Sequence, residues 1–128
     1  MVFVGLVITS FGFFIPAYIA FIRRRKKDAF RAGLLAVSSI AYHGTVHPVA
    51  HAIDACIAHG CGVIYFKETL DRIVIHKYFG DIVGLAGITS AGFIYLFKSK
   101  FNPHPSNSYW HLGLHILAQA TWCFHILV

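Results

Sequence analysis

Charged side chains are scarce in this sequence of 128 residues. Asp, Glu, Lys and Arg together make up 12% of the chain, whereas hydrophobic residues make up 57%. In ordinary soluble domains, about a quarter of the residues are charged. The core of one small soluble domain cannot bury so much apolar surface. The composition therefore favours a single transmembrane domain that covers residues 1–128.

The sequence also lacks the patterns of several other protein classes. Its three cysteines, Cys56, Cys61 and Cys123, form no CxxC pair and lie in apolar runs, so we expect buried thiols and no disulfide framework. Six of the eleven basic residues fall in RRRKKDAFR (23–31), which is not the spread expected of a nucleic-acid binder. No basic region or cleavage site accompanies the apolar N-terminus, so we expect residues 2–22 to be a retained span and not a signal peptide.

The uncharged stretches predict an all-α fold, a polytopic membrane helix bundle of four to five transmembrane helices. A hydrocarbon layer about 30 Å thick is crossed by about 20 helical residues. We place the spans at about 2–22, 32–46, 49–66, 82–97 and 108–128. Pro16 is expected to kink the first span, and Gly44 and Pro48 mark the break between the second and third. Residues 67–81 are expected to form a loop, part of it an interfacial helix.

The basic residues give these spans an orientation. A basic cluster directly after a span marks the cytoplasmic or matrix-like side of a membrane. The resulting topology places nine basic residues inside and two outside. It also brings four polar residues to one depth near the outer face, namely His43, Asp54, His111 and His115.

The segment SSIAYHGTVHPVAHAID carries several polar residues within an apolar part of the chain. Histidine and aspartate are costly inside a membrane unless they are paired or bound to something, so such residues indicate function. Ser39 and His43 are four residues apart and lie on one face of a regular helix. Asp54 follows eleven residues after His43, across the predicted turn.

A second pair, His111 and His115, has the same four-residue spacing near the C-terminus. Two histidines at this spacing can hold one zinc ion, and a third from another helix leaves the fourth tetrahedral position open, as in catalytic zinc sites. We therefore predict a zinc ion on His43, His111 and His115. Asp54 is predicted to orient a water molecule and take its proton, and Ser39 to hydrogen-bond the water or a substrate carbonyl.

Each of these residues also has a simpler interpretation. An HxxxH pair arises by chance in a chain with nine histidines. Asp54 can serve only to neutralise a neighbouring histidine, and Ser39 can bond back to its own helix. We expect the histidines at 47, 51 and 59 to be supporting or interface residues, and those at 76 and 104 to lie in loops. His125 follows ten residues after His115, too far along the helix to share its ligand set.

Together these motifs resemble the signature of the CREST superfamily of membrane proteins, which includes alkaline ceramidases and progestin/adiponectin-receptor proteins. The matching elements are SxxxH at Ser39 to His43, Asp54, and HxxxH at His111 to His115. AYHGT, the later IYF, FFIPAYIAF before the basic cluster, and HLGLHILAQATWCFHIL are also similar to family segments. The resemblance implies a shortened family member that hydrolyses an amide bond in a membrane lipid with zinc on the three histidines, in an endomembrane.

Two alternatives remain open. LLAVSSIAYHG and AHAIDACIAHG also resemble the small membrane-anchor subunit of succinate dehydrogenase, which implies haem b on His43, a quinone site beside Asp54 and the mitochondrial inner membrane. The third interpretation is a non-catalytic membrane subunit of a larger complex. Membrane lipid is the expected partner, with no nucleic acid, and the chain is open to homo- or hetero-oligomers within the membrane.

Overall fold

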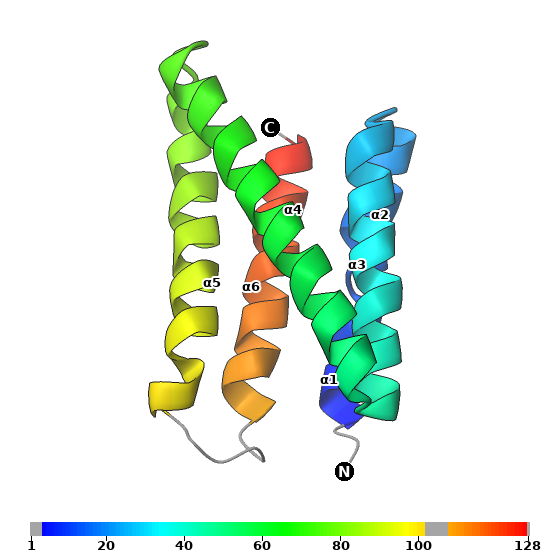
Figure 1. The fold of residues 1–128 in the computed structure, drawn as a ribbon. Helices are drawn as coiled ribbons and strands as arrows, with labels where there is room; N and C mark the ends of the chain where they lie inside the picture. The colour runs from blue at the N-terminus through cyan, green and yellow to red at the C-terminus, as the bar shows by residue number, and fades with distance from the viewer. Residues whose placement is uncertain (1–3, 102–107, 128) are drawn as a thin grey trace.

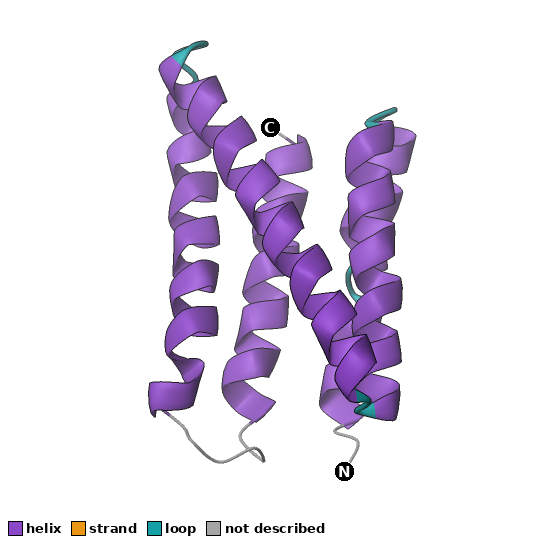
Figure 2. Cartoon of the chain, viewed as in Figure 1, coloured by secondary structure: helices purple, strands orange, loops and turns teal. Residues whose placement is uncertain are grey.

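The computed structural model describes residues 4–101 and 108–127, and these consist of helices joined by short turns (Figures 1 and 2). Over these residues there is no strand, which confirms the all-α prediction. The elements are α1 (Val4–Phe11), α2 (Phe14–Ile22), α3 (Lys26–Thr45), α4 (Pro48–Val74), the 3₁₀ helix η1 (Phe79–Asp81), α5 (Ile82–Phe101) and α6 (Ser108–Leu127).

The helices form a ring in which each column packs on two neighbours. Helices α1 and α2 together make one column, which contacts α3 on one side and α6 on the other. Helix α3 packs on α4, α4 on α5, and α5 on α6, which closes the ring. Figure 1 shows α4 crossing the bundle diagonally, from the turn after α3 to the opposite end. This ring brings residues from every column toward one central space.

Two helical stretches are long and apolar enough to cross a membrane, judged by length and composition. They are Val4–Ile22 and Pro48–Val74, and the apolar part of α5, Ile82–Phe97, is shorter. Membrane association thus has support from these two stretches. The larger number of four to five spans stays a prediction.

The first column is interrupted close to the proline that was expected to kink it. Pro16 lacks a backbone donor, and its ring crowds the carbonyl four residues earlier, which belongs to Gly12. Helix α1 ends at Phe11 and α2 begins at Phe14, so the break falls at that carbonyl. Across it, the amide of Ile15 donates to Gly12 over three residues at 3.0 Å. Pro16 then lies in the first turn of α2, where a missing N–H is tolerated.

The break predicted between Gly44 and Pro48 is confirmed. Helix α3 ends at Thr45, and Val46 adopts a left-handed conformation with φ of 53° while its amide donates to the Tyr42 carbonyl at 2.7 Å. His47 then caps α4, because its Nδ1 accepts from the amide of Val49 at 3.2 Å. Pro48 occupies the first helical position, where its fixed φ suits the helix.

The loop expected over residues 67–81, part of it helical, is shorter than predicted. Helix α4 continues to Val74, and η1 follows after a short turn. Two ion pairs lie on this extension: Lys67 pairs with Asp71 one turn later at 2.6 Å, and Glu68 pairs with Arg31 of α3 at 2.9 Å. The charged residues that suggested a loop therefore stabilise the last turns of a helix.

The expectation of buried thiols is also wrong. Cys56 is exposed, and Cys61 and Cys123 are only half-buried. The reason is that apolar residues are not confined to the interior of this bundle. Large exposed apolar side chains occur on each column, including Ile8, Phe21, Phe30, Val63, Leu96 and Ile116.

The interior is correspondingly rich in polar groups. Among the described residues, the buried polar and charged side chains are Ser10, Asp28, Ser38, Ser39, His43, Asp54, Thr69, Asp81, His115, Thr121 and His125. Soluble domains show the reverse distribution, with polar groups mostly outside. An apolar exterior around a polar interior is what an apolar surrounding medium favours.

Candidate metal centre

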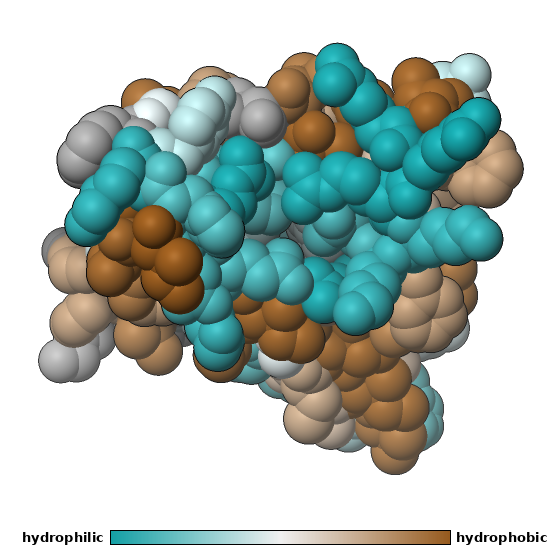
Figure 3. Space-filling model, turned by 90° about the horizontal axis from the view of Figure 1, so that it is seen from above, coloured by the Kyte–Doolittle hydropathy of each residue, from teal (hydrophilic) through white to brown (hydrophobic). Residues whose placement is uncertain are grey.

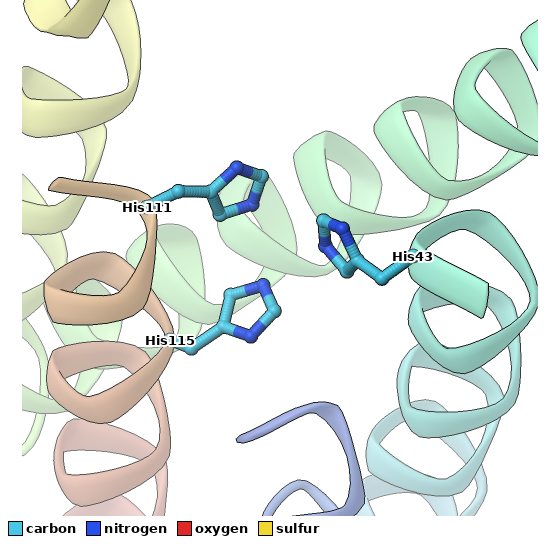
Figure 4. Close-up of side chains that lie close together, drawn as sticks. All are labelled: His43, His111 and His115. Atoms are coloured by element: carbon cyan, nitrogen blue, oxygen red, sulfur yellow. The ribbon is translucent and has the colours of Figure 1, made fainter. Parts of the chain in front are cut away.

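Three histidines from two helices converge at one end of the ring. His43 lies in the last turn of α3, and His111 and His115 lie on successive turns of α6. The ring centroids are 4.8 Å apart for His43 and His111, 5.2 Å for His43 and His115, and 4.8 Å for His111 and His115. Figure 4 shows the rings facing a common space. The structure thus brings together the three residues selected from the sequence, and their role as ligands stays a prediction.

The spacing of their nitrogens can be compared with what a zinc ion needs. One ring nitrogen from each histidine lies within 4.8 Å of those of the other two. Tetrahedral zinc at about 2.0–2.1 Å from each nitrogen would set the nitrogens about 3.3 Å apart. Small side-chain rotations that bring the rings closer by about 1.5 Å would therefore close the site. His43 and His115 are buried, so the donor set is largely shielded.

His115 has two further neighbours in the first column. Its Nδ1 lies 3.1 Å from the Thr9 hydroxyl of α1. Its ring also meets that of Phe13 edge to face, with centroids 5.4 Å apart. The orientation of this imidazole is therefore determined by α1 and the α1–α2 break as well as by α6.

Asp54 and Ser39 lie inside the ring of helices, and each is bonded to a serine that was not among the predicted site residues. The Ser38 hydroxyl donates to Oδ1 of Asp54 at 2.8 Å. Ser39 Oγ lies 2.9 Å from Ser10 Oγ, and Ser10 donates to the Leu6 carbonyl at 2.6 Å. Because Ser10 has one proton, Ser39 is the donor in their bond. The one available signal for Ser38 was its place next to Ser39 in the polar segment.

A cavity of about 430 Å³ lies within the ring and reaches the histidines. Its polar lining includes Ser39, Asp54, His111 and His115. Most of the remaining wall is apolar and comes from all the columns, with Phe13, Leu35, Ala58, Ile88, Leu114 and Trp122 as examples. The predicted catalytic residues and two of the predicted ligands thus face one apolar space.

The other described histidines have their own contacts. His51 stacks on Tyr42 with centroids 4.6 Å apart, and Tyr42 in turn lies against His43 at 4.5 Å. Nδ1–H of His59 donates to the Ala55 carbonyl at 2.6 Å. His76 lies in the exposed turn after α4, as expected, and position 104 lies outside the described residues. His51 is therefore linked to His43 through the ring of Tyr42.

A second polar cluster surrounds His125 at the other end of the bundle, where Figure 3 shows hydrophilic side chains gathered over the end face. Arg25 and Arg72 donate to the His125 carbonyl at 3.0 and 3.2 Å, and they also approach its two ring nitrogens. These bonds satisfy carbonyls that the end of α6 would otherwise leave open. We call this pair of arginines the arginine clamp.

Three ligand-type residues in this second cluster, Asp28, Glu68 and His125, also lie close enough to hold a metal ion. Their carboxylates are already paired, since Arg25 bonds Asp28 at 2.7 Å and Arg31 bonds Glu68 at 2.9 Å. A cation entering here would meet the positive charge of these guanidinium groups. The histidine cluster offers three imidazole nitrogens in place of carboxylates that are already bonded to arginines, so we take it as the candidate metal centre.

Comparison with models of known families, with curated proteins and with solved structures finds no match to this chain. The family resemblance of its motifs therefore stays a prediction.

Proposed function

We propose that this chain is a multi-pass membrane protein that binds zinc on His43, His111 and His115 and hydrolyses an amide bond of a membrane lipid. The observation that carries the proposal is the convergence of these three histidines beside an apolar cavity that also contains Asp54 and Ser39. The short motifs that resemble the CREST superfamily point to the same chemistry.

The distribution of side chains supports placement of the whole ring in a membrane. Helices α3 and α6 expose large apolar residues just as the two longer apolar stretches do, with Phe30 and Ile116 as examples. Exposed apolar surface on every side is unfavourable in water and favourable against lipid. Five columns crossing together would also give each column the two neighbours that it has in the ring.

The donor set fits a catalytic type of metal site. Zinc held by three histidines supplies a Lewis acid with one position left for water or a substrate oxygen. Asp54 would accept a proton from the attacking water, and the Ser38 hydroxyl holds Oδ1 of this carboxylate in place. Ser39 donates to Ser10 in the structure, so its hydroxyl would turn toward the cavity to bond the substrate carbonyl.

The cavity supports a lipid as the substrate. Its wall is mostly apolar, and Ser39, Asp54, His111 and His115 are among its polar lining residues. Each methylene of an acyl chain buried there would contribute about 0.8 kcal/mol. A substrate with a hydrocarbon chain and an amide at one end would match this arrangement.

Metal and absorption analysis of one detergent-purified sample tests the site. We expect about one zinc ion per chain and no haem absorption, because three histidine side chains converge on one space. A Soret band would instead favour the haem-binding anchor subunit. Absence of both metal and haem, even after incubation with zinc, would indicate the non-catalytic subunit and contradict the proposed site.

Hydrolysis of lipid amides tests the chemistry. Ceramides of several chain lengths would be offered to the zinc-loaded protein, before and after removal of the metal by a chelator. Asp54→Asn is expected to lower the rate by about 10²–10⁴ because it removes the proton acceptor. Asp71→Asn is the matched control, since Asp71 lies on the surface paired with Lys67. Equal rates in the two variants would rule out the role given to Asp54.

A further inference from the structure

We infer that Thr9 is a positioning residue that orients His115 for zinc, an inference that rests on the proposed metal site. Thr9 contacts α6 through both its side chain and its backbone. Its hydroxyl lies 3.1 Å from Nδ1 of His115, and its carbonyl accepts from Nε2 of Gln119 at 2.5 Å. His115 and Gln119 are four residues apart, so they lie on one face of α6. One residue of α1 thus holds two successive turns of the helix that supplies two of the ligands.

The proton on the Thr9 hydroxyl can be assigned from its other neighbours. Thr9 Oγ1 lies 3.0 Å from the Gly5 carbonyl and 3.2 Å from the Leu6 carbonyl, and a carbonyl can only accept. The single hydroxyl proton therefore points to its own helix, as is common for threonine. The oxygen is left to accept from Nδ1–H of His115.

This assignment determines the tautomer of His115. A neutral imidazole that carries its proton on Nδ1 has its lone pair on Nε2. Histidines that ligate metals generally donate their other N–H to a neighbouring oxygen, which orients the ring and makes the ligand more basic. Thr9 Oγ1 is such an oxygen, and it acts on the metal through His115 without touching it.

The break in the first column makes the second contact possible. Gly12 lies three residues after Thr9, just beyond the end of α1, and its amide donates to the Thr9 carbonyl at 3.0 Å. A methyl group added at Gly12 would overlap the side-chain amide of Gln119. Gly12 therefore leaves the space in which Gln119 reaches the Thr9 carbonyl. This hydrogen bond fixes the position of α1 along the axis of α6.

The test compares three threonine variants of the full chain in detergent. Thr9→Val keeps the shape but removes the hydroxyl oxygen, Thr9→Ser keeps the oxygen, and Thr89→Val removes a hydroxyl that bonds the Leu85 carbonyl on α5, a helix without a ligand. Zinc affinity is measured by competition with a chelator, the ligand environment by the visible spectrum of the cobalt-loaded protein, and folding by the unfolding temperature without metal.

We expect Thr9→Val to weaken zinc binding by about 10- to 100-fold and to change the cobalt spectrum. Thr9→Ser and Thr89→Val should match the wild type in both measurements, and the unfolding temperatures without metal should agree. Wild-type affinity in Thr9→Val, or an equal loss in Thr9→Ser, would overturn the role of Thr9 while leaving the zinc site. A wild-type chain that binds no zinc would overturn both.

Discussion

Two histidines on one helix have opposite surroundings. His115 and His125 both lie on α6, ten residues or about 15 Å apart along the axis, and their relative exposures are 5% and 1%. His115 meets two other imidazoles and a hydroxyl. His125 meets guanidinium groups at both ring nitrogens and the ring of Tyr65. Burial alone therefore says little about what a histidine does, and the charge of its neighbours says more.

The same contrast separates the two clusters as wholes. Both bring three ligand atoms within 4.8 Å of one another, but in one of them the carboxylates already neutralise arginines. That cluster is a set of ion pairs and hydrogen bonds that joins α3, α4 and α6 at one end of the bundle. The histidine cluster instead gathers three imidazoles beside a cavity, and in the proposed site these would bind the cation.

The largest effect should come from exchanging histidine for alanine at the two ends of α6. His115→Ala is expected to abolish zinc binding, because only two of the three ligand nitrogens would remain in the site. His125→Ala should keep one zinc per chain, since the clamp bonds mainly the backbone there, but should cost about 2–4 kcal/mol of stability through the cavity left behind. Elemental analysis and thermal unfolding of both variants check this, and equal zinc loss would remove the distinction between the ends.

The next effect concerns the ion pair between Arg72 and Asp81. Their atoms Nε and Oδ2 lie 2.7 Å apart, and the Asp81 side chain is fully buried. Arg72→Met is expected to destabilise the protein by about 3–5 kcal/mol because it leaves a buried carboxylate without its partner. The double change Arg72→Met with Asp81→Asn should recover part of this loss. Lys67→Met, which breaks an exposed pair with Asp71, serves as the control and should leave the unfolding midpoint nearly unchanged.

The smallest effect should come from the turns at the two ends. Val46 at the histidine end and Lys77 at the other end both have positive φ, at 53° and 56°. Val46→Gly is expected to stabilise the protein by about 1 kcal/mol, because a β-branched residue is strained in this region. Lys77→Gly should stabilise the protein by a smaller amount. A drop in unfolding temperature for Val46→Gly would show that the valine side chain contributes more through packing than it costs in strain.

Local signals predicted much of this architecture. The turn after α3 followed from Gly44 and Pro48, and the break in the first column lies where Pro16 disturbs its i−4 carbonyl. The proximity of His43 to the C-terminal pair followed from charge asymmetry between the loops, which set the direction of each helix. These signals act over a few residues, or they follow from the opposite directions of successive helices.

Contacts between distant helices were not predictable in this way. Ser38 and Thr9 are ordinary hydroxyl residues in the sequence, and their importance depends on which neighbours the helix rotation gives them. Arg25 was assigned to a basic loop, yet its side chain bonds the end of α6, one hundred residues later. The charges over residues 67–74 suggested a loop because the partners of Glu68 and Arg72, on α3 and in η1, are visible only in three dimensions.

The arginine clamp has a consequence for the metal site at the other end of the bundle. A helix behaves as a stiff rod that turns about 100° and advances about 1.5 Å for each residue. A slip of α6 by a single residue would carry His111 and His115 away from His43. By holding the final carbonyls of α6, Arg25 and Arg72 set its rotational phase, and with it the direction in which both imidazoles emerge.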